Sequence, residues 1–163
     1  PYYHARPWSA ALAGKRVLVV HPFRRTILAQ YEKRTQLFPG KDVLPELASL
    51  TVIQAVQGLG GQDTGYADWF DALTEMERRM DAANYDVAIV GAGAYSLPLA
   101  AHARDTGHAA IQMSGATQLL FGIKGKRWDD HPVISKLYNP AWVRPDETEG
   151  ISNKEKVEGG SYW

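Results

Sequence analysis

The sequence predicts an α/β domain in which a mainly parallel sheet of at least four strands lies between two layers of helices. Two observations favour this class. Short apolar stretches alternate strictly with amphipathic segments, and these stretches are apolar on both faces, as buried parallel strands are. Right-handed crossovers between such strands place helices on both sides of the sheet. The expected architecture is therefore a three-layer domain of Rossmann-like or flavodoxin-like kind.

The strands are predicted from stretches that are partly β-branched and bounded by Gly, His or polar residues. They are Lys15–Val20, Leu50–Val56, Asp86–Val90 and Ala109–Met113. The longer helices are Arg24–Phe38, stopped by Pro39-Gly40, then Asp68–Ala83, and Ser96–Arg104, stopped by Gly107. Shorter helices are expected at Pro7–Gly14, Thr117–Ile123 and His131–Tyr138. Asp68 and Asp71 begin the second long helix, where carboxylates favour the positive end of the helix dipole, so we expect them to act as caps.

Residues 1–138 are expected to form one domain, and residues 139–163 an irregular tail packed on it. One domain is the default for a chain of 163 residues with an apolar fraction of 45%. The tail is rich in Pro, Gly and charge, and we expect Trp142, Tyr162 and Trp163 to anchor it. The loop Gln57–Gly65 is expected to be flexible from its composition. Because the chain begins without Met, it is expected to be processed or to be the C-terminal part of a longer protein.

Charge and cysteine content exclude several classes of partner and site. Lys plus Arg and Asp plus Glu both number 18, so no global basic field argues for nucleic acid or an anionic membrane. Without cysteine there is no disulfide, zinc-thiolate site, iron–sulfur cluster or Cys nucleophile. No apolar run approaches the roughly 18 residues that a membrane span needs, and no signal-peptide pattern begins the chain. We therefore expect a cytoplasmic protein with no membrane span and no nucleic-acid partner.

Four loops are expected to hold the ligand site, because open parallel sheets bind ligands beyond the carboxyl ends of their strands. These loops are His21–Arg25, Gln57–Gly65, Gly91–Ser96 and Ser114–Gln118. These loops contain most of the candidate ligand-binding residues of the chain. There is no G-x-S-x-G elbow, Walker loop or HExxH motif, so hydrolase and nucleotide-triphosphatase hypotheses lose their usual support.

The third loop has the pattern G-x-G-x-x-S, formed by Gly91, Gly93 and Ser96, with Tyr95 inside it. Its glycines permit a tight turn, and the N–H groups of the helix that follows favour an anion. A dinucleotide site would also have an acidic residue at the end of the next strand, where this chain has Gln112. We therefore expect no NAD, and predict contact with a phosphate or a nucleotide-sugar. The alternative is that the glycines only make a tight turn from strand to helix.

The fourth loop combines Ser114, Gly115, Thr117 and Gln118 directly after a strand. Hydroxyl and amide groups there suit sugar hydroxyls, a uracil edge or phosphate oxygens. Lys124, Lys126 and Arg127 follow, and Lys124 is the predicted contact to a diphosphate. The alternatives are helix capping by Ser114 and Thr117, and a solvated basic loop.

His21, Arg24 and Arg25 follow the first strand. An imidazole at a strand end can be a general base, and an arginine in the first turn of a helix can bind a phosphate. The alternative for His21 is a hydrogen-bonded loop residue. Asp129-Asp130-His131 and Glu147-Thr148-Glu149 carry ligand types for a divalent metal, but solvent-facing carboxylates are the favoured interpretation, so no metal residue is predicted.

The segment from about Asp86 to Trp128, with the tail WVRPDETE…KVEGGSYW, resembles an uncharacterised bacterial family associated with surface-polysaccharide biosynthesis regions. The layout of strand, glycine turn, helix with Leu-Ala, short strand and polar Gly-containing loop is more remotely similar to the glycosyltransferases with the GT-D type fold. That resemblance implies nucleotide-sugar donors, an Asp-x-Glu metal motif and an acidic residue after the strand equivalent to Ala109–Met113. This chain departs at both places, with Gln112 in place of the acid and only Glu147-x-Glu149 in the tail.

The leading hypothesis is transfer of a glycosyl unit, or recognition of the nucleotide-sugar, in bacterial polysaccharide biosynthesis. In it His21 is the base for the acceptor, Gly91, Gly93 and Ser96 approach the diphosphate, Arg24 or Lys124 neutralises it, and Ser114 and Gln118 contact sugar or base. The alternatives are a non-catalytic small-molecule or nucleotide-binding module of a larger protein, and an oligomerisation domain whose aromatic tail packs on a neighbour in a homo-oligomer. The cofactor stays unknown.

Overall fold

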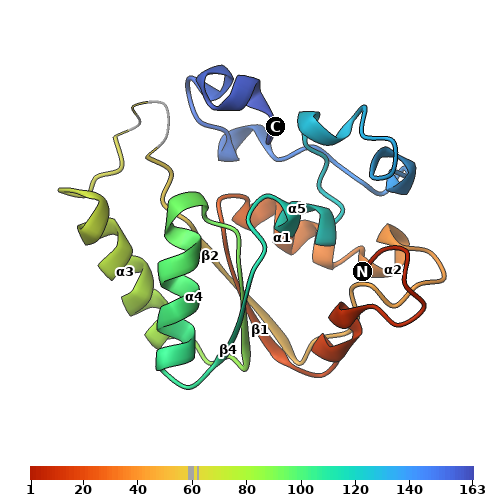
Figure 1. The fold of residues 1–163 in the computed structure, drawn as a ribbon, viewed down its shortest axis with the longest axis horizontal. Helices are drawn as coiled ribbons and strands as arrows, with labels where there is room; N and C mark the ends of the chain where they lie inside the picture. The colour runs from red at the N-terminus through yellow and green to blue at the C-terminus, as the bar shows by residue number, and fades with distance from the viewer. Residues whose placement is uncertain (59–60, 62) are drawn as a thin grey trace.

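A computed structural model describes residues 1–58, 61 and 63–163, and its centre is a sheet of four parallel strands (Figure 1). The strands are β1 (Arg16–His21), β2 (Ser49–Gln54), β3 (Val87–Val90) and β4 (Ala109–Gln112), in the order β2-β1-β3-β4. Val17 of β1 pairs with Leu50 on one side and with Val87 on the other. The predicted parallel α/β sheet is confirmed, with strand ends that lie within two residues of the predicted ones.

The two faces of the sheet pack against different helices, which follows from the alternation of side chains along each strand. Val17 and Val19 belong to one buried cluster, and Leu18 and Val20 to the other. The helices α1 (Arg24–Tyr31) and α5 (Ala116–Leu120) cover the first face, and α3 (Trp69–Asp81) and α4 (Ser96–Asp105) cover the second (Figure 1). The domain therefore has three layers.

The predicted helix Arg24–Phe38 is wrong in its extent, because the chain leaves the helical path at Lys33 (φ −99°, ψ 14°). A short helix, α2 (Arg34–Leu37), follows the break. The buried amide of Gln30 donates to the carbonyl oxygens of Gly122 and Ala141, and the break turns the fully buried Leu37 towards Gly122. The apolar pattern continues across this break, which is why it predicts one helix.

The other helices agree in position with the prediction and differ in length or type. Asp68 accepts hydrogen bonds from the N–H groups of Phe70 and Asp71, so its capping role is confirmed. The helix predicted at Pro7–Gly14 is a 3-10 helix, Trp8–Leu12, and only Ser135–Leu137 of the predicted His131–Tyr138 helix is helical, again as 3-10. Every helix in the described part of the chain is too short or too polar to cross a membrane.

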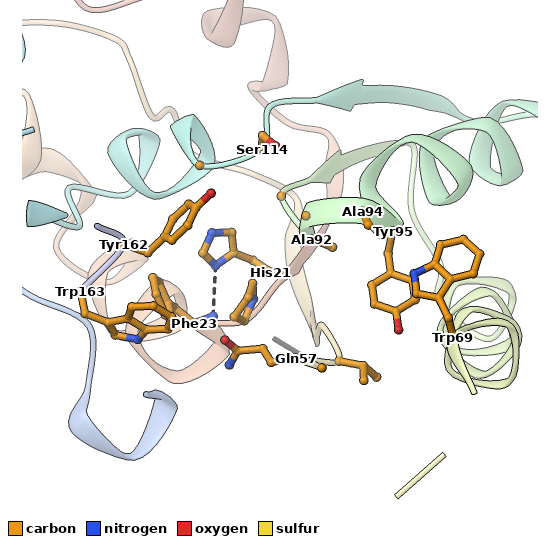
Figure 2. A pocket seen from close by; sticks show the side chains of 16 residues that line it. His21, Phe23, Gln57, Trp69, Ala92, Ala94, Tyr95, Ser114, Tyr162 and Trp163 are labelled. Carbon is orange, nitrogen blue, oxygen red and sulfur yellow. Dashed lines mark hydrogen bonds between the residues drawn. The ribbon is translucent and has the colours of Figure 1, made fainter. Parts of the chain in front are cut away.

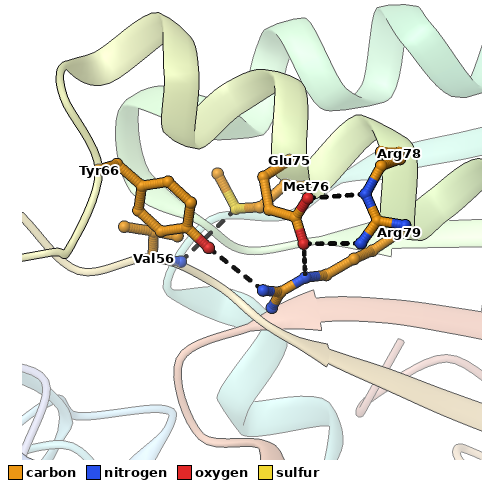
Figure 3. A network of polar contacts seen from close by, with 6 residues as sticks. All are labelled: Val56, Tyr66, Glu75, Met76, Arg78 and Arg79. Carbon is orange, nitrogen blue, oxygen red and sulfur yellow. Dashed lines mark hydrogen bonds and ion pairs between the residues drawn. The ribbon is translucent and has the colours of Figure 1, made fainter.

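The helix α3 is joined to the segment that follows β2 by a polar network (Figure 3). Arg79 donates to the Glu75 carboxylate and to the Tyr66 hydroxyl, and the Val56 N–H donates to the Met76 sulfur. Hydrogen bonds from Arg78 and Arg79 lower the pKa of Glu75 to about 2, so this carboxylate stays ionised at any physiological pH. The network holds Val56 at the carboxyl end of the sheet. Part of the Gln57–Gly65 loop, predicted to be flexible, lies outside the described residues.

The tail, residues 139–163, contains short 3-10 turns and lies at the carboxyl end of the sheet, next to α1 and α5 (Figure 1). Trp142 is buried and its indole N–H donates to the carbonyl oxygen of Leu37. Ile123 and Val143 form an isolated parallel bridge. These contacts fix the beginning of the tail on the domain, and its last two residues, Tyr162 and Trp163, lie beside the loops that follow the strands.

Candidate functional site

The carboxyl ends of β1 and β3 lie side by side where the strand order changes direction, and a pocket of about 240 Å³ lies there (Figure 2). The chain passes from β1 outwards to β2 and then returns to place β3 on the other side of β1, so the loops after β1 and β3 separate and leave a crevice. The pocket is lined by His21, Pro22, Phe23, Val56, Gln57, Gly58, Trp69, Gly91, Ala92, Gly93, Ala94, Tyr95, Ser114, Gly115, Tyr162 and Trp163. All four strand ends and the end of the tail therefore contribute to it.

Gly91 is the point at which three of these loops meet. A Cβ atom at this position would lie 2.5 Å from Thr117 Oγ1, 2.6 Å from the carbonyl oxygen of Ser114 and 2.8 Å from His21 Cδ2. Its own N–H donates to the carbonyl oxygen of Val20, which continues the β1–β3 pairing. A residue without a side chain is therefore required for the close approach of these segments, independently of any ligand.

His21 is 3% exposed, and its Nδ1 accepts a hydrogen bond from the Phe23 N–H at 3.0 Å (Figure 2). In a neutral imidazole this acceptor role leaves the proton on Nε2. Burial lowers the pKa of His21 to about 3, so the ring is neutral at physiological pH. Nε2 has no hydrogen-bond partner among the described residues. The geometry therefore favours an Nε2–H donor on an imidazole ring that lines the pocket, while the general-base role of His21 stays a prediction.

The buried neutral state of His21 predicts a pH dependence of stability. The unfolded chain takes up a proton near pH 6.5, whereas the folded chain does so only near pH 3, so the unfolded state binds more protons between these values. Stability is therefore complete above about pH 6.5 and is lost as the pH falls. We expect the free energy of unfolding in urea to fall by about 2 kcal/mol from pH 7 to pH 5.

The comparison variant is His21→Asn, whose amide oxygen replaces Nδ1 as the acceptor and does not titrate. Most carboxylates remain ionised between pH 7 and pH 5, so the variant should lose much less stability than the wild type over this interval. Equal losses in the two proteins would show that His21 is protonated at its ordinary pKa.

Two backbone donors lie at the rim of the pocket, in the 3-10 turn Gly93–Tyr95. The N–H groups of Gly93 and Ala94 have no acceptor among the described residues, and both residues are exposed. The hydroxyl of Ser96 is turned inwards and accepts the Ala92 N–H at 2.7 Å. The Ser96 hydroxyl therefore supports this turn, and the N–H groups of Gly93 and Ala94 are the donors that the turn leaves available.

Aromatic rings form the walls of the pocket. Trp69 and Tyr95 are stacked, with ring centroids 5.0 Å apart and an angle of 6° between the planes. On the opposite side Trp163 packs edge-on against Phe23, at 6.1 Å, and Tyr162 lies beside it (Figure 2). None of the described residues that line the pocket is Asp, Glu, Lys or Arg. The pocket therefore combines apolar ring surface with uncharged hydrogen-bonding groups.

Ser114 has a φ of +49°, in the left-handed region that L-residues other than Gly rarely adopt. A serine in this conformation costs about 1–2 kcal/mol. Its hydroxyl forms no hydrogen bond with the described residues, and α5 has no side-chain cap, so the alternative in which Ser114 and Thr117 cap a helix is not observed. The hydroxyl of Ser114 is therefore unpaired beside the pocket.

The structure brings six of the predicted site residues together around this pocket and places the other seven elsewhere. The six are His21, Gly91, Gly93, Tyr95, Ser114 and Gly115. The seven that do not line it are Arg24, Arg25, Ser96, Gln112, Thr117, Gln118 and Lys124. Thr117 and Gln118 are fully buried behind the pocket wall, and Gln112 is exposed at the end of the edge strand β4.

The three predicted phosphate-binding cations are directed elsewhere. Arg24 Nε donates to the carbonyl oxygen of Val52, and Arg25 Nη1 donates to the hydroxyl of Thr148. Lys124 Nζ lies over the ring of Tyr138, 5.3 Å from its centroid. The side-chain carboxylate of Glu149 already occupies the N-terminus of α1.

The expectation that Glu149 faces solvent is wrong, because its side chain is buried with 3% exposure. Its carboxylate accepts the N–H groups of Arg25 at 2.5 Å and Thr26 at 3.1 Å, and the hydroxyl of Thr26 at 2.5 Å. The free N–H groups of the helix explain why an anion is stable there. In the described part of the chain, no group of three or more His, Asp and Glu side chains could hold a metal ion.

The residues that sequence reasoning missed are Gln57, Trp69, Ala94, Tyr162 and Trp163. The tail aromatics are predicted only as anchors, and Trp69 only as part of the helix Asp68–Ala83. Gln57 lies in a loop that the strand-end rule identifies, and its amide donates to the carbonyl oxygen of Glu149 at 3.3 Å. The strand-end rule is therefore a sufficient signal for Gln57 and Ala94, but not for the tail.

Comparisons with known proteins give no relative: no protein-family model matches the chain, and no curated protein or solved structure is significantly similar to it.

Proposed function

We propose that this protein binds a nucleotide-sugar, with the sugar ring in the pocket between the ends of β1 and β3. One observation carries the proposal: the pocket lies at the switch point of a parallel sheet, and its described lining consists of aromatic rings and uncharged hydrogen-bonding groups. The resemblance to a family associated with polysaccharide biosynthesis regions supports the same ligand class. A cytoplasmic role in polysaccharide assembly is part of this proposal.

The hydrogen-bonding groups suit sugar hydroxyls, which both donate and accept. His21 Nε2–H and the N–H groups of Gly93 and Ala94 supply donors for hydroxyl or phosphate oxygens. The hydroxyls of Ser114 and Tyr162 can donate or accept, and neither is bonded to a described residue. The apolar faces of the aromatic rings suit the carbon skeleton of the sugar.

The size of the pocket limits what it can hold. About 240 Å³ is less than the roughly 300–1,000 Å³ of pockets that enclose a whole drug-sized ligand. The pocket therefore holds one ring of the ligand, and the remainder of a nucleotide-sugar extends past the rim.

The lining favours binding over glycosyl transfer. It contains no carboxylate among the described residues, and its one imidazole, that of His21, uses Nδ1 to accept the Phe23 N–H and so has its proton on Nε2. Transfer would need a group able to accept a proton from the acceptor hydroxyl. The wild-type protein is therefore expected to bind the donor without hydrolysing it.

The test uses one variant that fills the pocket and one that does not. Ala94, in the 3-10 turn before α4, and Leu97, in the first turn of α4, are both exposed and three residues apart, but only Ala94 lines the pocket. The wild type should melt at a higher temperature with at least one of UDP-glucose, UDP-galactose and GDP-mannose, because a ligand at 100 times its Kd adds about 2.7 kcal/mol to stability. Ala94→Trp should lose this shift, and Leu97→Trp should keep it.

Two outcomes would contradict the proposal. One is the absence of a melting shift in the wild type with every nucleotide-sugar, and the other is an equal shift in Ala94→Trp and Leu97→Trp. An oligomerisation domain would give the first outcome together with a multimeric mass in solution.

A further inference from the structure

Arg127 lies directly behind one wall of the pocket, although it does not line the pocket itself. Its guanidinium carbon is 4.0 Å from the ring centroid of Tyr162, a pocket residue. Its Nη1 is 3.5 Å from the position that a Cβ atom on Gly115, another pocket residue, would occupy. A ligand that extends from the pocket past Tyr162 and Gly115 therefore meets this cation first.

The guanidinium is only partly satisfied by the protein. Its Nε and Nη2 donate to the Ser161 hydroxyl at 3.3 Å and 2.6 Å, and Nη2 also forms an ion pair with Glu158. Nη1 has no hydrogen-bond partner among the described residues. The Arg127 side chain is 26% exposed, so one end of its planar fork is open to a ligand.

The carboxylate that pairs with Arg127 is held weakly. The Glu158 side chain is 63% exposed, and an ion pair of this exposure contributes little to stability. The same carboxylate accepts the Ser161 hydroxyl at 3.2 Å, which is long for a hydrogen bond between two oxygens. Because water can hydrate the released carboxylate, another anion can replace it at little cost.

We propose that Arg127 is the phosphate-binding residue of this site, and that the Glu158 carboxylate occupies its guanidinium until a phosphate group of the ligand displaces it. The assignment rests on the proposed function for the part of the ligand that lies in the pocket. The planar fork of Arg matches two phosphate oxygens, which a point charge such as that of Lys does not. It supplies the cation that the described lining of the pocket lacks, while Arg25 and Lys124 are directed elsewhere.

The test combines two substitutions with opposite expected effects. Arg127→Gln removes the phosphate-binding cation, and Glu158→Gln removes the competing anion. Lys126→Gln is the matched control, because it removes the same charge from the adjacent residue, whose Nζ donates to the carbonyl oxygen of Gly159 at 3.4 Å. Affinities for inorganic pyrophosphate, for the nucleotide-sugar that stabilises the wild type and for its free sugar are measured by calorimetry at low ionic strength.

Arg127→Gln should weaken binding of pyrophosphate and of the nucleotide-sugar by about tenfold or more, and should leave the affinity for the free sugar unchanged. Glu158→Gln should strengthen binding of both phosphate-bearing probes by about three- to tenfold. Lys126→Gln should stay within about twofold of the wild type. If Arg127→Gln does not fold, as judged by circular dichroism, Glu158→Gln decides the question alone.

The assignment of Arg127 is overturned if Glu158→Gln leaves the affinity for both phosphate-bearing probes unchanged or weaker. It is also overturned if Lys126→Gln and a folded Arg127→Gln have equal effects. If Ala94→Trp abolishes nucleotide-sugar binding while the substitutions at residues 127 and 158 leave it unchanged, the proposed function stands and the assignment of Arg127 is rejected. If pyrophosphate binding depends on Arg127 but no nucleotide-sugar binds, the proposed function is rejected and the assignment of Arg127 stands.

Discussion

Replacing Gly91 by alanine should destabilise the protein by about 3 kcal/mol or more, which is the upper end of what overpacking costs. The new methyl group would lie between 2.5 and 2.8 Å from atoms of Thr117, Ser114 and His21. One of the three is a backbone carbonyl oxygen, and the others belong to buried side chains, so no flexible group can move aside. The free energy of unfolding, measured with urea at pH 7, gives the loss.

The matched control for this substitution is Gly93→Ala, two residues further along the same loop. Gly93 has a φ of +57° but no atom within 4 Å of a Cβ position, so alanine there adds conformational strain without a clash. It should cost about 1 kcal/mol. The difference between the two variants isolates the effect of the clash, and equal losses would contradict the packing that we describe around Gly91.

The Gly91 substitution also tests the link between packing and the site. Because His21 Cδ2 is one of the three atoms in the way, relief of the clash must move the imidazole or the loop after β4. Any folded Gly91→Ala protein should therefore show shifted ring signals of His21 in NMR spectra, whereas Gly93→Ala should leave them unchanged.

The sheet was predictable from the sequence because a strand that is buried on both faces is a short continuous apolar stretch. The central strands β1 and β3 are short apolar runs that are buried on both faces, whereas the edge strands β2 and β4 are only partly buried and show a weaker form of the pattern. The position of the pocket follows from the same pattern, because carboxyl ends of parallel strands always share one edge. This is why the strand pattern alone predicts that His21, Gly91 and Ser114 lie together at that edge.

The roles of individual polar side chains were not predictable in the same way. Position in the first turn of a helix does not reveal the direction of a long side chain, and Arg24 and Arg25 both point away from the pocket. The partner that occupies the N-terminus of α1 is Glu149, 123 residues beyond Thr26 in the chain, and a Glu-x-Glu pair in a charged segment is typical of solvated surface. Only tertiary structure reveals such contacts.

The tail illustrates a similar limit of sequence reasoning. Aromatic residues in an irregular segment predict that it packs on something, but not which surface it covers. Tyr162 and Trp163 lie beside Phe23 at the end of β1, where their rings complete the pocket wall. The carboxylate of Glu149 fixes the tail to α1 and so directs its end towards the pocket, and this contact has no counterpart in the local sequence pattern.

Replacing Glu149 by alanine should destabilise the protein by about 2–3 kcal/mol, measured in urea at pH 7. The substitution removes three hydrogen bonds to a charged acceptor and leaves the N–H groups at the beginning of α1 without a partner in a buried setting. Glu149→Gln keeps one acceptor oxygen but places an amide N–H₂ against these donors, so we expect a smaller loss. Glu147→Ala, in the same 3-10 turn but exposed, should change stability by less than about 0.5 kcal/mol.

Glu149→Ala should also loosen the tail selectively, because Glu149 connects the tail to both α1 and the loop after β2. Its carbonyl oxygen accepts the amide N–H of Gln57, and its carboxylate holds Arg25 and Thr26. Limited proteolysis should therefore cut Glu149→Ala within residues 144–163 under conditions in which the wild type and Glu147→Ala remain intact. Cleavage there releases Tyr162 and Trp163, so the cut protein should also lose its melting shift with a nucleotide-sugar. Resistance of Glu149→Ala to cleavage would mean that the aromatic contacts, and not the carboxylate, hold the tail against the pocket.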